Sequence, residues 1–380
     1  MKRLRFLLSL LLAAPAAAAT WDTRVQEMTP AAGYCVTGLI AGQMQTAACT
    51  SLVTPGFGLA GGSALAYDPT QISWAPRNRL LNSGFAIDQR NNGAACTIGV
   101  ASGTAHYCQD RWAIVESASG SGLTAARTAI MAGGIAYAGR IQRAASSMNT
   151  NTVTLAQVLE SAPNIDLQGK AVTFSFRARA GANWSGGNPV AAIVTGIGAD
   201  QSSASFFAGS WPGQATCGST SASLTASFAF YTVNCTIPVG AVQIGISLSW
   251  AWSGTAGAAD YIDITDVELV SGTYSAAQIV PERPAPGKVL FDCRRYYESI
   301  PAAAGASYAP ASGWGFPTYF SFAAHKRAMP TVTLVSVSAT GGTVTVYNIT
   351  QDQVAVQITS TGSGVIFWRT TSGIIADAEL

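Results

Sequence analysis

The chain has 380 residues, enough for two or three domains with cores of their own, and only 11% of them are charged, against about 25% in an average soluble domain. Its 48% hydrophobic content argues against intrinsic disorder. With 21 basic and 19 acidic residues, the chain lacks the concentrated positive charge of a nucleic-acid-binding protein. The chain contains two histidines, His106 and His325, which argues against a metal centre built from histidines.

Residues 1–19 have the pattern of a secretory signal. Lys2, Arg3 and Arg5 precede a short apolar run over residues 6–12, and alanines at 17–19 offer a cleavage site. Cleavage would leave 18 basic against 19 acidic residues, a net charge of −1. The run is shorter than the ~20 residues that span a bilayer, so no membrane span is expected in the mature chain. The alternative is a hydrophobic N-terminal helix that is retained as an anchor or assembly peg.

Cysteine spacing indicates an oxidising environment. Six of the seven cysteines form local pairs separated by 14, 12 and 18 residues: Cys35 with Cys49, Cys96 with Cys108, and Cys217 with Cys235. None of them has the C-x-x-C spacing of zinc or redox motifs. Three local disulfides are the expectation, with Cys293 unpaired. Six cysteines permit 15 connectivities, so other pairings stay open, and free buried thiols are the further alternative.

The central part of the chain is typical of a mainly β protein. Residues 20–76 show no clear period, whereas from about Arg77 onward short runs are bounded by Gly, Asn, Ser and Pro. Residues 171–178 alternate as a half-buried strand does, and so do residues 242–250. Residues 155–161, after Thr154 as a candidate N-cap, predict a helix of about two turns.

The C-terminal part begins after a proline-rich connector at residues 281–286. A second helix is predicted over 287–300. Residues 331–337 and 343–347 are alternating β-branched runs separated by Ala339–Gly342, which predicts a hairpin. Many short strands with turn signals favour antiparallel sandwiches over a parallel α/β sheet.

Several segments resemble those of a domain common in tailed-phage tail-fibre and spike-type virion proteins, and they occur in the family's order. They are Asn78–Phe85, Asp88–Arg90, Asp110–Trp112, Leu167–Arg179, Asp266–Gly272, Glu282–Pro284, Cys293–Tyr297, Lys326–Val332 and Ala376–Leu380. No single segment is specific to the family, but their occurrence in the family's order over about 300 residues is a much stronger signal.

The resemblance implies a jelly-roll domain akin to carbohydrate-binding modules over residues 77–284, a linker helix over 285–304 and a smaller β-sandwich tip over 305–380. It also implies a homotrimer, and we expect it to contact a cell-surface polysaccharide. The resemblance covers residues 77–380 and does not extend to residues 1–76; residues 20–76 are expected to be an N-terminal anchoring or adaptor region that meets other virion proteins. The signal and the paired cysteines depart from the family's pattern, so an exported relative remains open beside a phage, prophage or gene-transfer particle.

No catalytic residues are predicted, and no cofactor is expected other than a structural calcium ion. Neither histidine accompanies a G-x-S-x-G nucleophile motif, and the sequence does not pair two carboxylates across a cleft. Asp260, Asp263 and Asp266 are close enough along the chain to contribute oxygen ligands to calcium, and solvated or turn-capping carboxylates are the alternative.

Tryptophans in polar loops are the candidate glycan contacts, because sugars offer flat C–H faces and many hydroxyl groups. Trp184 and Asn188 share a loop of amides and glycines, Trp211 precedes Pro-Gly, and Trp314 lies between two glycines. Packing at a sandwich end or a subunit interface is the alternative for each tryptophan. Trp250 and Trp252 fall on one face of a strand and are expected in the core.

Three functions follow in order of preference. The first is a non-enzymatic fibre or spike component of a phage or phage-like particle that binds host glycans. The second is an exported glycan-binding protein of the periplasm, cell surface or medium. The third, well behind, is a glycan-modifying enzyme.

Overall fold

The computed structural model describes residues 77–99 and 105–380, together with the backbone of four N-terminal strands. Those strands pair as two antiparallel hairpins, β1 (Tyr34–Ile40) with β2 (Gln43–Ala48) and β3 (Phe57–Ala60) with β4 (Ala64–Tyr67). They belong to a unit that ends at Pro76, and residues 77–380 form a second unit. The predicted signal, and the predicted Cys35–Cys49 bond, lie outside the residues whose side chains are described.

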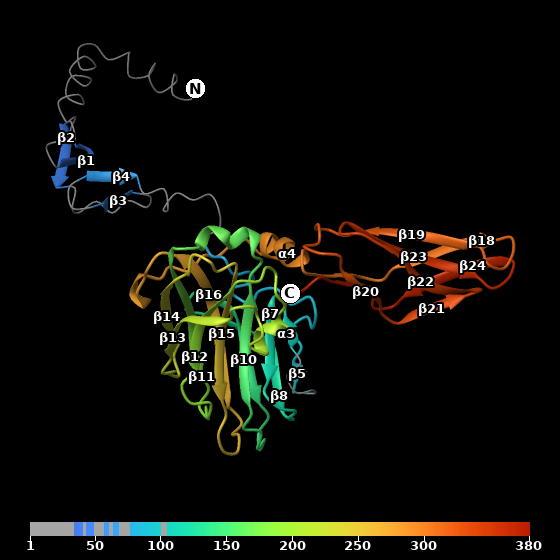
Figure 1. The fold of residues 1–380 in the computed structure, drawn as a ribbon, viewed down its shortest axis with the longest axis horizontal. Coiled ribbons are helices and arrows are strands. Elements are labelled where there is room, and N and C mark those ends of the chain that lie inside the picture. The colour runs from blue at the N-terminus through green and yellow to red at the C-terminus, as the bar shows by residue number, and fades with distance from the viewer. Residues whose placement is uncertain (1–33, 41–42, 49–56, 61–63, 68–76, 100–104) are drawn as a thin grey trace, which may run out of the picture. The chain divides into compact units, whose positions relative to one another are not determined.

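The first part of the second unit is a jelly-roll β-sandwich of two six-stranded antiparallel sheets (Figure 1). One sheet has the order β13-β12-β15-β10-β7-β6 and the other β14-β11-β16-β9-β8-β5, so the chain crosses repeatedly between the layers. The strands are β5 (Cys96–Ile98), β6 (His106–Gln109), β7 (Trp112–Glu116), β8 (Leu123–Ala132), β9 (Ile135–Arg143), β10 (Thr152–Val158), β11 (Ala171–Ala180), β12 (Val190–Gly196), β13 (Ala215–Ser221), β14 (Ala229–Thr236), β15 (Gln243–Ala251) and β16 (Tyr261–Ser271).

Alternation of apolar side chains builds the core between the two sheets. Phe174 and Phe176 of β11 face Ile246 and Leu248 of β15, and all four are fully buried. The strands predicted at 171–178 and 242–250 are thus confirmed. The polar side chains of Thr173 and Ser175 on the other face of β11 are also buried, and Thr173 hydrogen-bonds to Asn234 of β14 and to the backbone of Tyr274.

The helix predicted at 155–161 is wrong, because residues 155–158 belong to β10 and residues 159–161 are not helical. Val153 and Leu155 point into the core, and the strand hydrogen-bonds to β7 on one side and β15 on the other. Short apolar runs do not distinguish a buried strand from a helix by periodicity alone. The helical turns in this part are η3 (Ala162–Leu167), α3 (Ser203–Phe207) and η4 (Ala276–Gln278).

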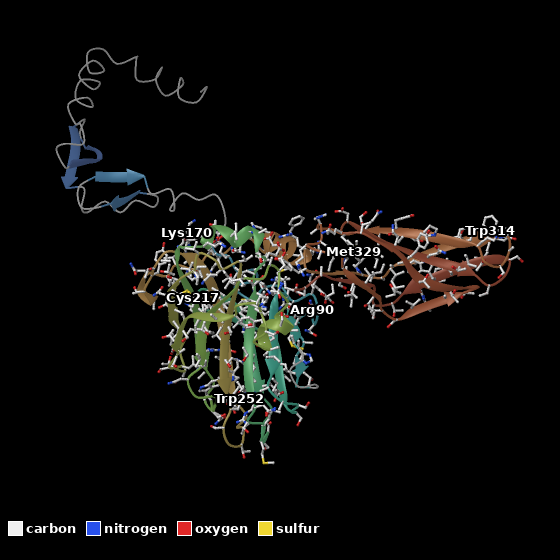
Figure 2. The ribbon with its side chains drawn as sticks, in the orientation of Figure 1. Arg90, Lys170, Cys217, Trp252, Trp314 and Met329 are labelled. Atoms are coloured by element: carbon white, nitrogen blue, oxygen red, sulfur yellow. A yellow bond between two sulfur atoms is a disulfide. The ribbon has the colours of Figure 1, made fainter. Side chains whose placement is uncertain are left out.

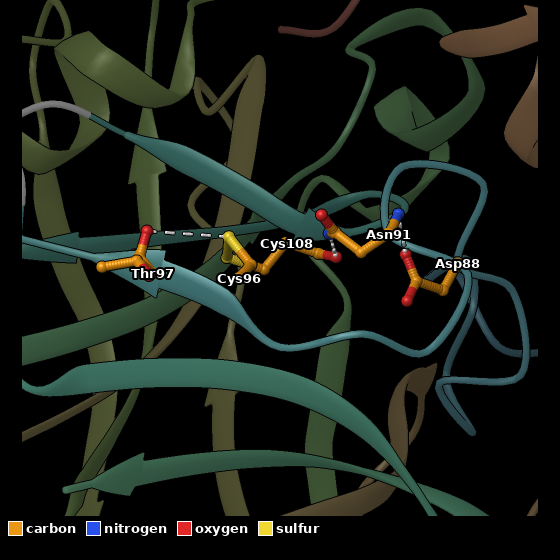
Figure 3. The surroundings of a disulfide bond; sticks show 5 residues. All are labelled: Asp88, Asn91, Cys96, Thr97 and Cys108. Carbon is orange, nitrogen blue, oxygen red and sulfur yellow. Dashed lines mark hydrogen bonds between the residues drawn. A yellow bond between two sulfur atoms is a disulfide. The ribbon is translucent and has the colours of Figure 1, made fainter. Parts of the chain in front are cut away.

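Two disulfides join the sheets at their opposite edges. Cys96–Cys108 connects β5 to β6, and Cys217–Cys235 connects β13 to β14. Figure 3 shows the first bond beside the loop in which Asn91 donates to the carbonyl of Cys108 at 2.6 Å. Both predicted pairings are confirmed, and closing loops of this size contributes about 3 kcal/mol each. Cys293 is free and buried.

The C-terminal part, called the tip below, follows helix α4 (Pro286–Arg294). Its strands form three three-stranded sheets, β17-β25-β20, β18-β24-β21 and β19-β23-β22 (Figure 1). Their bounds are β17 (Tyr297–Ile300), β18 (Ala304–Ala309), β19 (Gly315–Ser321), β20 (Thr331–Leu334), β21 (Val337–Thr340), β22 (Gly342–Ile349), β23 (Gln353–Ser360), β24 (Gly364–Thr370) and β25 (Ile374–Asp377).

Two details of the tip differ from the sequence-based prediction. The helix stops at Arg294, and residues 297–300 pair with β25 instead of extending it. The turn at Gly341 is present with a positive φ of 74°, but it joins strands of different sheets. β20 pairs with β25, β21 with β24 and β22 with β23, so the predicted hairpin is not formed.

None of the helices in the described part of the chain has the length and hydropathy needed to span a membrane.

Candidate functional site

A buried arginine organises the loops at one end of the sandwich. Arg143, the last residue of β9, is completely buried, and its Nε and Nη2 donate to Asp260 at 2.9 and 2.7 Å. Its Nη1 donates to the carbonyl of Asn149 at 2.7 Å, and its Nη2 also donates to Ser185 Oγ at 2.8 Å. One guanidinium therefore fixes the loops after β9, β11 and β15. We call this region the loop end.

The loop end contains a polar depression of about 640 Å³. It is lined by residues 119–122 and 144–151, a set of serines, asparagines, glycines and small side chains. Glu116 lies 1% exposed at the end of β7. Its Oε1 accepts hydrogen bonds from the side-chain amides of Asn149 and Asn151, the latter at 2.8 Å. The hydrogen-bonding groups of the depression are thus held in place before any ligand arrives.

Trp184 lies at the surface of an aromatic cluster at the same end. Its ring centroid is 5.0 Å from that of Trp252 and 6.1 Å from that of Trp250, both of which are buried as predicted. Trp252 is seen at the lower end of the sandwich in Figure 2. Trp184 itself is half-buried and donates to the carbonyl of Gly187 at 2.8 Å, while Asn188 is exposed in the same loop. Trp184 and Asn188 remain candidate ligand contacts.

The other two predicted tryptophans lie elsewhere. Trp211 is 3% exposed, and packs on Phe206 of α3 with Val158 and Val194 of the adjacent sheet face. It covers apolar strand residues that would otherwise meet water, which removes it from the candidate ligand contacts. Trp314 is 53% exposed in the loop between β18 and β19 of the tip (Figure 2), so the structure does not bring it together with Trp184.

The three aspartates considered for calcium lie on or beside β16 but serve separate ion pairs. Asp260 accepts from Arg143, Asp263 from Arg140 and Arg179, and Asp266 from Arg283. Arginines already occupy the carboxylate oxygens that calcium would need, and no group of three metal-ligating side chains is found in the described part of the chain. These residues do not fit a calcium site, which corrects that prediction.

The segments that carry the family resemblance meet where the sandwich contacts the tip. Arg111, 2% exposed, pairs with Glu379 and lies 3.6 Å from the ring centroid of Tyr296. Arg90 pairs with Glu379 at 3.2 Å and with Asp377 at 3.1 Å, and also stacks on Tyr297. We call this cluster the junction, and its role is to hold the two parts of the unit together. The sequence contained these segments, but nothing in their spacing indicated that they are in contact.

Asp110 in the junction provides a pH-dependent test. Burial raises the pKa of its carboxyl from 3.8 to about 6, although Gln89 donates to it at 2.8 Å. A raised carboxyl pKa means that the charged form destabilises the folded protein above about pH 6 and that the effect disappears below about pH 4. We expect Asp110→Asn to raise the free energy of unfolding by up to about 3 kcal/mol at pH 8 and to change it little at pH 4. Chemical denaturation at both pH values measures this, and equal effects at both would contradict it.

Comparisons with known proteins assign no family. No protein-family model and no curated protein matches this chain. Among solved structures, the enzymatically active domain of tailspike protein 4 from bacteriophage CBA120 is 12% identical with a TM-score of 0.31; the match covers 52% of this chain and 22% of that one. TmCBM61 in complex with β-1,4-galactotriose is 15% identical with a TM-score of 0.29, covering 52% and 100%.

A third similar structure is the C-terminal family 22 carbohydrate-binding module of Clostridium thermocellum Xyn10B. It is 12% identical with a TM-score of 0.27, and the match covers 45% of this chain and 89% of the module. The chain thus spans about a fifth of the tailspike domain and most or all of the two modules. At these identities and TM-scores, membership of a family does not follow.

Proposed function

We propose that this chain is a non-enzymatic, glycan-binding fibre or spike component of a phage or phage-like particle, with the glycan bound at the loop end. The preorganised polar depression beside Glu116 carries the proposal. Sugars combine many hydroxyl groups with flat C–H faces. The depression supplies serine hydroxyls and main-chain groups, and Trp184 supplies part of an aromatic ring at the same end of the sandwich.

Filling the depression tests this site. Ala145 lines it, and its side chain is a methyl group without hydrogen-bonding atoms. Ala145→Trp therefore adds bulk without removing a polar group. We expect at least a tenfold loss of affinity, about 1.4 kcal/mol, for a glycan that the wild-type chain binds. Ala302→Trp, at an exposed position in the tip, is the matched control and is expected to bind normally. Unchanged glycan binding in Ala145→Trp would show that the glycan binds elsewhere.

A homotrimer is the second part of the proposal, and exposed apolar side chains on the tip support it. Tyr308 of β18 and Val365 of β24 lie opposite each other on one outward face and are 65% and 72% exposed. Phe367 continues the same face. Exposed apolar surface is characteristic of protein–protein contacts, and we infer that this face meets a second copy of the chain.

The double substitution Tyr308→Ser and Val365→Ser is expected to convert the trimer to monomers, because both side chains would lose a buried environment at the contact. Light scattering measures the mass. Val239→Ser, which changes an exposed valine of the sandwich, should leave the trimer intact. A wild-type chain that is monomeric at micromolar concentration would contradict the trimer.

The alternative is an exported glycan-binding protein, and the two disulfides favour it. Disulfides persist in oxidising compartments and are rare in the cytosol, where virion proteins assemble. Mass spectrometry of the mature N-terminus separates the two: a start near Thr20 supports export, and an intact Met1 opposes it.

The proposal gives the chain no catalytic role, and the surroundings of its histidines support this. His325 and its partner Asp352, 2.8 Å apart, are both exposed. His106 lies half-buried on β6. Glu116 is engaged by two asparagine amides and is buried, which suits a structural carboxylate better than an acid that meets substrate. A glycan-modifying enzyme therefore stays in third place.

A further inference from the structure

The outward face of the sheet β14-β11-β16-β9-β8-β5 carries a row of arginines. Arg179 of β11 pairs in register with Asp263 of β16, which pairs in turn with Arg140 of β9. Arg177 lies two residues before Arg179 on β11, opposite Phe230 of β14. These residues come from four neighbouring strands, so their side chains form one continuous surface.

Aromatic rings support the three guanidinium groups. Arg140 lies 3.7 Å from the ring centroid of Tyr261, Arg177 lies 4.4 Å from that of Phe230, and Arg179 lies 4.7 Å from that of Phe228. The three arginine side chains are 24%, 24% and 28% exposed. Stacking holds each planar group flat while leaving it accessible to solvent.

The carboxylates of this face lie beneath the arginines. Asp263 is fully buried and accepts from Arg140 Nε at 2.7 Å and from Arg179 Nε at 2.9 Å. Asp266, 6% exposed, pairs with Arg283 at 3.0 Å and with Arg177 at 3.5 Å. Four arginines against two buried aspartates leave a net charge of +2 directed at the solvent. The next carboxylate along β16, that of Glu268, is buried and pairs with Arg77.

Hydrogen-bond donors on this face remain available. Among the described residues, Arg179 has hydrogen bonds only from its Nε, so both of its terminal nitrogens lack a partner. Terminal guanidinium nitrogens match the oxygens of a carboxylate, sulfate or phosphate in bidentate geometry.

We propose that this arginine face binds the negatively charged groups of an acidic glycan, meaning sugars that bear carboxylate, sulfate or phosphate substituents. The inference rests on the proposed glycan-binding function but assigns a second surface, distinct from the loop end. Positive charge combined with half-buried aromatic rings suits an acidic sugar chain, which presents anionic groups and C–H faces together. The near-neutral charge of the whole chain disfavours a nucleic acid as the occupant.

The variant Arg177→Gln with Arg179→Gln tests the face without leaving either buried aspartate unpaired. Asp263 keeps Arg140, and Asp266 keeps Arg283. The charge-matched control replaces two exposed lysines elsewhere, Lys170→Gln with Lys288→Gln. The probes are dextran sulfate and polygalacturonate, with uncharged dextran for comparison, and Kd is measured on full chains at about 50 mM and about 300 mM NaCl.

We expect the wild-type chain to bind at least one anionic polymer, and the Kd to rise with salt. The arginine variant should lose at least about tenfold in affinity, whereas the lysine control should change about twofold or less. Absence of anionic binding by the wild type, an unchanged arginine variant, or an equal loss in the control would each overturn the proposal. The two sites can fail separately. If Ala145→Trp abolishes binding of a neutral glycan while the arginine variant keeps its affinity for anionic polymers, the loop-end site is supported and the arginine face is contradicted.

Discussion

Replacing Arg111 by methionine is expected to lower the free energy of unfolding by about 3–5 kcal/mol. The guanidinium is buried between Glu379 and the ring of Tyr296, and it also donates to the carbonyl of Val158 at 2.7 Å. Methionine fills much of the volume but leaves Glu379, whose side chain is 6% exposed, with Arg90 as its remaining basic partner. Removing one partner of a buried ion pair costs far more than removing an exposed pair, because the remaining charge stays out of water.

Calorimetry measures this loss of stability and also shows which part of the unit unfolds first. Because Arg111 belongs to the sandwich and Glu379 to the end of the tip, the variant should unfold with the tip separating first, as two resolved transitions. Arg79→Met, which removes an exposed ion pair with Asp166, is the control and should cost less than about 1 kcal/mol. A loss in Arg111→Met no larger than in the control would contradict the structural role of the junction.

Replacing Arg143 by methionine is expected to have a comparable effect on stability, about 3–5 kcal/mol, and also to abolish glycan binding at the loop end. The substitution leaves Asp260 fully buried without its cationic partner and removes donors to Asn149 and Ser185. Residues 144–151, which form one side of the polar depression, then lose their hydrogen bond to Arg143, so the ligand would have to order them on binding.

Urea denaturation measures the loss of stability in the Arg143 variant, and limited proteolysis tests the order of its loops, with new cleavage expected in residues 144–151. Arg79→Met provides the control, since it also removes an arginine ion pair, with Asp166, but belongs to neither proposed glycan-binding surface. A destabilised Arg143 variant with intact loops and normal glycan affinity would mean that the loop end is not organised by this residue.

The sequence allowed prediction of those features that depend on local pattern. Alternation predicted β11 and β15, and cysteine spacing predicted both disulfides that the described residues contain. Prediction from the sequence failed where the secondary structure of a segment depends on contacts with residues far along the chain. β10 lies between β7 and β15, so its apolar residues needed a strand and not a helix.

The candidate site was less accessible to prediction for the same reason. Trp184 stays a candidate from its loop composition, but Trp211 has a similar loop composition and is buried by contact with α3, 4 to 8 residues earlier in the chain. The arginines at 177 and 179 alternate visibly with apolar residues, whereas the aspartates and rings that flank them come from strands about 50 and 85 residues further along the chain. No local signal indicates which strands become neighbours.

The most direct test of the proposed adhesive role is size-exclusion chromatography of the full chain with a panel of purified bacterial surface polysaccharides, in which co-elution and polymer length are followed in the same run. We predict that at least one polysaccharide co-elutes with the protein and that its length and substituents stay unchanged over prolonged incubation. A chain that retains none of them, or one that shortens or deacetylates the polymer it meets, would contradict a non-enzymatic glycan-binding function.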